Sequence, residues 1–241
     1  MLKRVSTYLA ALALALPLTA GAVALRDLAC ILPGSDDPIV TREGLFRAHL
    51  VCHHLLIEIP DSMYDRDMLL STEFEAIAGS SNLIAPGTVV DNRVVRWLRH
   101  GNKVSLVFVN FEIGTARTPG IERAVEASSL PTVLKMFDIV GRGEKGEAII
   151  NVTPMFVNPP FAFALGFRKA FGMPDIDSER SYVARVKAFA DNIDIDYYQT
   201  WVADRNELLR RVDEGQESVT ASRGFMFSTN IYLLPEKPMR P

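Results

Sequence analysis

Apolar and polar residues alternate along much of the chain, and the alternation is clearest near the C-terminus. From residue 224 to residue 234 the largely apolar positions Phe225, Phe227, Thr229, Ile231 and Leu233 alternate with the mixed set Met226, Ser228, Asn230, Tyr232 and Leu234. This period of two predicts a strand with one apolar face. Proline has no N–H for a strand ladder and restricts the residue before it, so residues 235–241 are expected to leave the sheet as an extended segment.

The same alternation predicts strands elsewhere. Residues 46–59 read as a hairpin that ends at Pro60, and residues 68–76 as a further strand. A long strand over 193–201 is the natural antiparallel neighbour of 224–234. Two more hairpins are indicated by their turns, at residues 100–102 (His-Gly-Asn) and in the glycine-rich segment 141–146. Most of the chain is therefore expected to form antiparallel hairpins.

A few short helices complete this prediction. Thr118-Pro119 and Thr153-Pro154 each place a capping residue before a proline, and the apolar spacing after the first of them continues through Leu130, Val133, Leu134 and Phe137. Asp177 is a candidate cap for a helix over 178–190. Residues 158–174 are expected to be loop with some helix, and 204–217 a loop or arm. The expected fold class is α+β, with mainly antiparallel β hairpins or sheet and a few short helices.

Composition divides the chain into three parts. Residues 1–24 have a basic start, an apolar run and small residues, the order typical of a secretory signal peptide. Residues 25–42 read as a linker, and 43–241 as a β-rich region, with a division into subdomains at about 43–90 and 91–241 left open. The protein is expected to be exported, periplasmic or secreted, with no membrane segment after signal cleavage.

Charge and cysteine content narrow the possible partners. Losing Lys3 and Arg4 with the signal peptide takes the formal net charge from −3 to −5. An acidic domain with scattered basic residues gives no electrostatic reason to expect nucleic-acid binding. Cys30 and Cys52 are the two cysteines. In an oxidising compartment they either form a disulfide that ties the N-terminal segment to the first strands or remain two thiols, and the sequence leaves both open.

One cluster contains metal-ligand residue types: His49, Cys52, His53 and His54. On a strand, His49 and His53 would point to one side and the other two to the opposite side, so the four converge only if the turn twists them together. Structural zinc sites usually combine two separated ligand pairs, and the sequence has no second pair. We therefore expect an exposed hairpin turn, with no metal site assigned.

Other candidate chemistry has structural explanations. The carboxylate pairs Asp36-Asp37, Asp65/Asp67 and Asp194/Asp196 lie near no histidine or nucleophile motif, so loops and solvated strand faces are favoured over acid–base catalysis. The glycines of 141–146 precede a strand, whereas a phosphate-binding loop opens a helix. Phe161, Phe163 and Phe167 are interpreted as core or interdomain packing rather than a ligand surface. No catalytic or cofactor-binding residue is assigned.

Five segments together resemble the N-terminal region of bacterial exported zinc-dependent metalloproteases of the met-zincin type. They are GLFRAHLVCHHLLIEIPDSMYDRDMLL (44–70), VVRWLRHGNKVSL (94–106), FDIVGRGEKGEAIINVTPMF (137–156), RSYVARVKAFADNIDI (180–195) and YLLPEKPMRP (232–241). The resemblance implies two domains of uncharacterised function that precede a catalytic domain. The H-E-x-x-H motif of that catalytic domain has no counterpart in this sequence, so no zinc ligand or general base can be carried over.

The resemblance implies a non-catalytic accessory module, which we expect to be a truncated or separately encoded half of a zinc-metalloprotease-like exported protein. Its partner would be a metalloprotease catalytic domain or an envelope protein. The alternative is a free-standing periplasmic or secreted binding protein for a peptide or glycan. A third hypothesis is an enzyme with an unrecognised site in the turn at residues 49–54.

Overall fold

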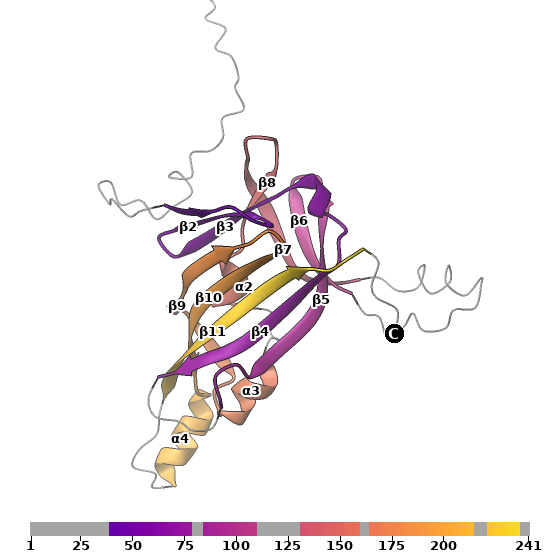
Figure 1. Cartoon of the computed structure of the whole chain (residues 1–241). Helices are drawn as coiled ribbons and strands as arrows, with labels where there is room; N and C mark the ends of the chain where they lie inside the picture. The colour runs from indigo at the N-terminus through magenta and orange to yellow at the C-terminus, as the bar shows by residue number, and fades with distance from the viewer. Residues whose placement is uncertain (1–38, 79–83, 110–130, 160–163, 215–220, 237–241) are drawn as a thin grey trace, which may run out of the picture.

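One curled antiparallel sheet organises the protein. The computed structural model describes residues 39–78, 84–109, 131–159, 164–214 and 221–236. Within these ranges eleven strands follow the order β1-β2-β3-β8-β7-β6-β5-β4-β11-β10-β9, and the sheet bends into a half-barrel (Figure 1). Its strands are β1 Val40–Arg42, β2 Arg47–Val51, β3 His54–Ile59, β4 Met68–Ile77, β5 Val89–His100, β6 Lys103–Phe108, β7 Thr132–Arg142, β8 Ala148–Asn151, β9 Asp175–Ala188, β10 Asn192–Val202 and β11 Ser222–Leu233.

Helices are short and few in the described residues: α2 Thr153–Val157, α3 Leu165–Ala170, α4 Arg205–Asp213 and the 3-10 turn Asp61–Met63. Strands account for 60% and helices for 13% of this part of the chain. The class is therefore mainly β, and the expected α+β class is wrong. None of the described helices is long and apolar enough to cross a membrane.

The hairpins expected from alternation are confirmed. Segments β2–β3, β5–β6 and β7–β8 each form an antiparallel pair, and β10 pairs with β11 from Asn192↔Tyr232 to Val202↔Ser222. The turn between β5 and β6 needs Gly101, whose φ of 62° is in the left-handed region. Strand β11 ends at Leu233, two residues before Pro235, the first of the terminal prolines. Alternation and turn residues thus predicted the pairing correctly.

Two predicted helices are strands, and a β-bulge explains both errors. The helix expected over 178–190 is most of β9, and the helical spacing expected through Phe137 falls in β7. Ala184 and Leu134 are extra residues at register shifts, because their strand neighbours pair with consecutive residues of the adjacent strand. A bulge changes the phase of alternation, so buried positions such as Val183 and Val186 lie three residues apart, as on a helix. The proposed helix start at Thr118-Pro119 lies outside the described residues.

Two helical details also differ from expectation. Residues 205–213 form α4 where a loop or arm was expected. Pro154 lies in the first turn of α2 as predicted, but Val152 holds the cap position, and it is Asn151 Oδ1 that accepts from the Thr153 amide at 3.0 Å. The Thr153 hydroxyl instead accepts a hydrogen bond from the Leu55 amide at 2.7 Å. Thr153 therefore joins α2 to β3 rather than capping its own helix.

Aromatic side chains fill the inner face of the half-barrel. Trp201 stacks on Phe225 with ring centroids 4.1 Å apart and on Phe227 at 5.5 Å, and Tyr197 stacks on Phe227 at 5.7 Å. Phe156 of α2 packs against Tyr197 of β10, with ring centroids 5.1 Å apart. All five are almost completely buried. Burial of this much aromatic area is the main stabilising contribution that the structure shows.

The two ends of the sheet approach each other through the β2–β3 hairpin. The Leu45 amide donates to the Phe189 carbonyl at 2.5 Å, and His53 Nδ1 donates to the Val183 carbonyl of β9 at 3.0 Å. Gly44 lies so close to the Phe189 backbone that a Cβ there would overlap it. These contacts cover part of the β9 edge, which would otherwise offer unpaired backbone groups to another chain.

Candidate functional site

The four metal-type residues of the first hairpin do not converge on one point. His49 is buried between strands: Nε2 donates to Glu58 Oε1 at 2.9 Å, and Nδ1 shares a hydrogen bond of 2.9 Å with the Thr41 hydroxyl. Cys52 is disulfide-bonded, which settles its state in favour of the bridge; Cys30 lies outside the described residues. His53 turns outward to β9, as described above. Within the described residues no group of three or more His, Cys, Asp or Glu side chains is placed to hold a metal ion.

The hairpin turn itself is tight and partly anchored rather than simply exposed. Cys52 and His53 have φ values of 46° and 65°, the left-handed pair that a two-residue hairpin turn requires. Such angles are uncommon for residues other than glycine. The His53 ring also packs edge-on against Tyr182, with centroids 5.0 Å apart. The turn residues therefore hold the hairpin against β9.

The carboxylate pairs in the described residues are engaged by basic groups. Asp67 and Asp65 both pair with Arg96, the second at 3.4 Å. Asp194 binds Lys187 at 2.8 Å and accepts from the Ser228 hydroxyl at 2.6 Å. Asp36-Asp37 lies outside the described residues. These pairings support the interpretation of loops and strand faces over that of acid–base pairs.

Asp196 on β10 belongs to the same outer face as Asp194. Its side chain is only 4% exposed and pairs with Arg185 of β9. Burial raises the pKa of nearby Glu75, and the charge of Asp196 raises it further. Ion pairs therefore join β9 and β10 on this face, and Glu75 of β4 lies close enough to feel the charge of Asp196.

The glycine segment and the phenylalanine-rich stretch both have structural roles in the residues that the structure describes. Residues 143–146 form the turn between β7 and β8, as expected for a glycine segment followed by a strand. Phe171 packs on Trp201 and Phe225, and Phe167 packs against the core. Phe161 and Phe163 lie outside the described residues. The aromatic stretch thus contributes to the core through each member that the structure describes.

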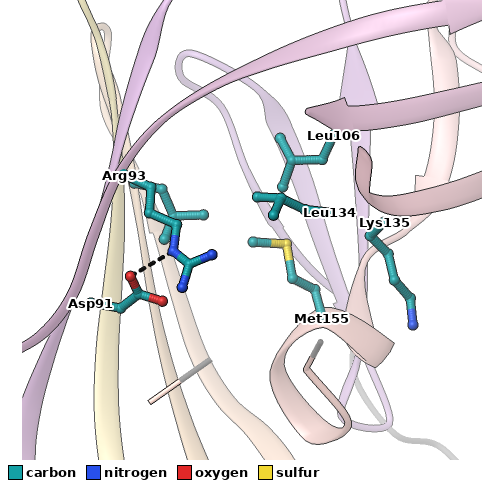
Figure 2. Close-up of a pocket in the computed structure, with 7 residues that line it drawn as sticks. Asp91, Arg93, Leu106, Leu134, Lys135 and Met155 are labelled. Carbon is teal, nitrogen blue, oxygen red and sulfur yellow. Dashed lines mark hydrogen bonds and ion pairs between the residues drawn. The ribbon is translucent and has the colours of Figure 1, made fainter. Parts of the chain in front are cut away.

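A small cavity opens on the inner side of β4, β5, β6 and β7, where Met155 of α2 reaches toward them, and Figure 2 shows its lining. Arg93 Nε donates to Asp91 Oδ1 at 2.7 Å, and the guanidinium faces the side chains of Leu134 and Met155. Asp91 Oδ2 is buried without a hydrogen-bond partner in the described residues. The cavity volume is about 30 Å³. Since a water needs roughly 10–15 Å³, the space suits a water or two rather than a metabolite.

A larger hollow lies on the outer side of the sheet, at the ends of β10 and β11 that α4 connects. Figure 1 shows these strand ends and α4. Its volume is about 610 Å³. We call it the outer hollow; it is lined by Ala78, Arg180, Tyr198, Thr200, Ser222, Arg223 and Gly224. Among these described lining residues none is acidic, and two are arginines. This size suits a small molecule, whose binding site typically measures roughly 300–1,000 Å³.

Sequence reasoning did not single out the residues of the outer hollow. Arg180 lies in the segment expected to form a helix over 178–190, and Tyr198 lies in the strand expected over 193–201. Arg223 precedes the strand expected over 224–234. They meet because β9, β10 and β11 are neighbours in a register that pairs Thr200 with both Gly224 and Asp177. One signal was present: Gly224 interrupts a strand, and a strand glycine often marks a close approach of another group.

Comparison with known proteins identifies the family. A family model described as a domain of unknown function, DUF5117, matches residues 87–241. Because this covers most of the chain, the protein belongs to the DUF5117 family. No curated protein matches the chain, and no solved structure matches it either. The description of this family does not mention metalloproteases. The link to metalloproteases therefore stays a hypothesis based on the sequence resemblance.

Proposed function

We propose that this DUF5117 protein is a non-catalytic accessory module of an exported zinc-metalloprotease-like protein, and that it acts by binding a partner rather than by transforming a substrate. The observation that carries this proposal is that the histidine and cysteine side chains best suited to bind zinc or act as nucleophiles form structural contacts instead. His49 is held by hydrogen bonds at both ring nitrogens, and Cys52 is disulfide-bonded. A histidine and a cysteine used in this way are not available as zinc ligands or nucleophiles.

Two further observations support the proposal. The ordered resemblance to the N-terminal region of exported metalloproteases spans residues 41–241, and the family match covers 87–241 of the same stretch. A disulfide at Cys52 is typical of proteins that fold in an oxidising compartment, which supports export. The partner implied by the resemblance is a metalloprotease catalytic domain.

The experiment starts from the DNA that follows the coding sequence. A reading frame that encodes H-E-x-x-H, whether continuous with this chain or separate from it, supplies the partner to be tested. The two segments are then produced together and apart, and their association is measured by size-exclusion chromatography at micromolar concentration. We expect one co-eluting complex. If no such reading frame exists, or if the two segments elute separately, the accessory role fails.

The second candidate function is a free-standing envelope binding protein for a small polar ligand. The observation that favours it is the outer hollow, which has a suitable volume and a polar lining. This function needs no protease partner. The two candidates therefore differ in whether a second polypeptide must be present for the protein to act.

A further inference from the structure

We propose that the outer hollow is a binding site for a small ligand that carries an oxyanion, either the carboxylate of an acidic sugar or a phosphate group. This inference goes beyond the accessory role and does not depend on it. It follows from three features of the hollow: a guanidinium that is already fixed in place, and a second guanidinium and a tyrosine hydroxyl that have no hydrogen-bond partner among the residues that the structure describes.

Arg180 is held in position by its neighbours. Its Nε donates to Asp177 Oδ2 at 2.7 Å and its Nη1 donates to the Ser222 hydroxyl at 3.2 Å. Asp177 also accepts from the amides of Glu179 and Arg180, at 3.0 and 3.1 Å. The bond from Arg180 lowers the pKa of Asp177, so the pair stays ionised at neutral pH. The remaining terminal nitrogen, Nη2, has no hydrogen-bond partner among the described residues and is free to bind a ligand.

The path of β9 creates the space beside this arginine. Tyr182 pairs with Tyr198 and Asp177 pairs with Thr200, so residues 178–181 of β9 lie opposite Gln199 alone. The extra residues are fixed from within, because the Ser181 hydroxyl donates to the Asp177 carbonyl at 2.6 Å and accepts from the Thr200 amide at 3.0 Å. Bulges of this kind re-aim side chains and are frequent beside binding sites.

Arg223 supplies the second positive charge. Its guanidinium makes no ion pair or hydrogen bond with the described part of the chain, whereas neighbouring Arg180 and Arg185 are both paired with aspartates. Asp177 compensates only one of the two guanidinium groups that line the hollow. An unpaired guanidinium offers a planar set of donors that matches a carboxylate or phosphate with two parallel hydrogen bonds. The hollow therefore favours an anion.

Tyr198 is the rigid wall of the hollow. Its ring lies across Gly224 so closely that a Cβ at this position would overlap the phenol oxygen. The Tyr198 ring also stacks against the Tyr182 ring of β9, with ring centroids 5.4 Å apart and ring planes inclined by 23°. Its hydroxyl has no hydrogen-bond partner within the described residues. A fixed donor beside two guanidinium groups gives the site a preorganised set of polar contacts.

The test is a calorimetric titration of the whole exported chain with sodium glucuronate, inorganic phosphate and glucose. Glucuronate and phosphate distinguish the two sources of the oxyanion, and glucose removes the charge while keeping the sugar. Titration at low ionic strength and again at physiological salt measures screening of the interaction. Three variants accompany the native protein: Arg223→Gln, Tyr198→Phe and, as a matched loss of one arginine charge, Arg142→Gln at the end of β7.

We expect saturable binding of one of the two anions and much weaker binding of glucose. Arg223→Gln should weaken the anion about tenfold or more, as expected for loss of a charged hydrogen bond. Tyr198→Phe keeps the ring over Gly224 and should weaken binding several-fold, which decides the question if Arg223→Gln proves unfolded. Arg142→Gln should bind as the native protein does. The proposal is overturned if neither anion saturates, if glucose binds equally well, or if Arg142→Gln loses as much affinity as the hollow variants.

Discussion

The inner and outer faces of β10 show how one strand serves two purposes. Inward, Ile193, Ile195, Tyr197 and Trp201 join the aromatic core, and all are nearly inaccessible to water. Outward, Asp194 and Asp196 pair with basic residues of β9, and Tyr198 and Thr200 line the outer hollow. Apolar burial contributes far more to stability than exposed ion pairs do. The inner face should therefore determine folding, and the outer face is free to carry recognition.

Removing the largest inner side chain should have the largest effect. Trp201→Ala deletes a buried ring that stacks on Phe225 and Phe227, which is expected to cost about 3–5 kcal/mol of unfolding free energy. Urea denaturation measures it, with Tyr232→Ala, a half-exposed aromatic of β11, as the control. A loss no greater than that of the control would contradict the assignment of stability to the inner face.

Within β11 the effect should follow burial. Ile231 is 2% exposed, whereas Leu233 near the strand end is only partly buried. Ile231→Ala is expected to cost about 2–5 kcal/mol and Leu233→Ala clearly less, because less packing is lost. The same denaturation experiment compares the two variants. Equal losses would mean that the strand end is packed by something besides the described core.

The buried phenol of Tyr197 should make stability fall at alkaline pH. Burial raises the pKa of Tyr197 well above its ordinary value, while hydrogen bonding with Thr229 and Thr72 partly offsets this. Because the folded-state pKa is the higher one, stability is complete below the unfolded pKa of about 10 and declines above it. The decline is about 1.4 kcal/mol per pH unit for this proton. Tyr197→Phe should flatten the profile measured between pH 8 and the alkaline limit of about 11; parallel profiles would refute this account.

The smallest effect is expected on the outer face. Arg185 is 60% exposed and pairs with Asp196. Arg185→Gln should change the unfolding free energy by about 1 kcal/mol, since solvent screens the exposed arginine side of the pair and Lys187 stays 4.0 Å from the buried Asp196 carboxylate. High salt should reduce the difference further. A cost comparable to that of Ile231→Ala would show that the outer charges support the fold after all.

Local sequence signals predicted the regular part of the fold and failed at its irregularities. Alternation identified strands such as 68–76 and 193–201, and the turn at Gly101 identified its hairpin. The bulges at Ala184 and Leu134 could not be foreseen, because an extra residue in a strand gives the same apolar spacing as a helix. Because these bulges made the segments of β7 and β9 look helical, the sequence favoured an α+β class, whereas both segments pair as strands in a mainly β fold.

The candidate site was harder to predict for a different reason. His49 and the residues of the first turn drew attention because they cluster in the sequence, yet hydrogen bonds and a disulfide engage them in the fold. Arg180, Tyr198 and Arg223 are spread along the chain and meet through strand register, which single-sequence patterns do not specify. Gly224 alone carried a local sign that another side chain approaches the strand closely.

The most direct test of the central claim, that the reactive residue types of this protein serve its fold, is the zinc content of the chain purified after export. Native mass spectrometry and elemental analysis at saturating zinc should find no stoichiometric metal, and casein should remain intact. The disulfide at Cys52 and the bonded ring of His49 are the physical reasons for this expectation. One zinc per chain that disappears when His49, Cys52, His53 and His54 are replaced together would contradict the account.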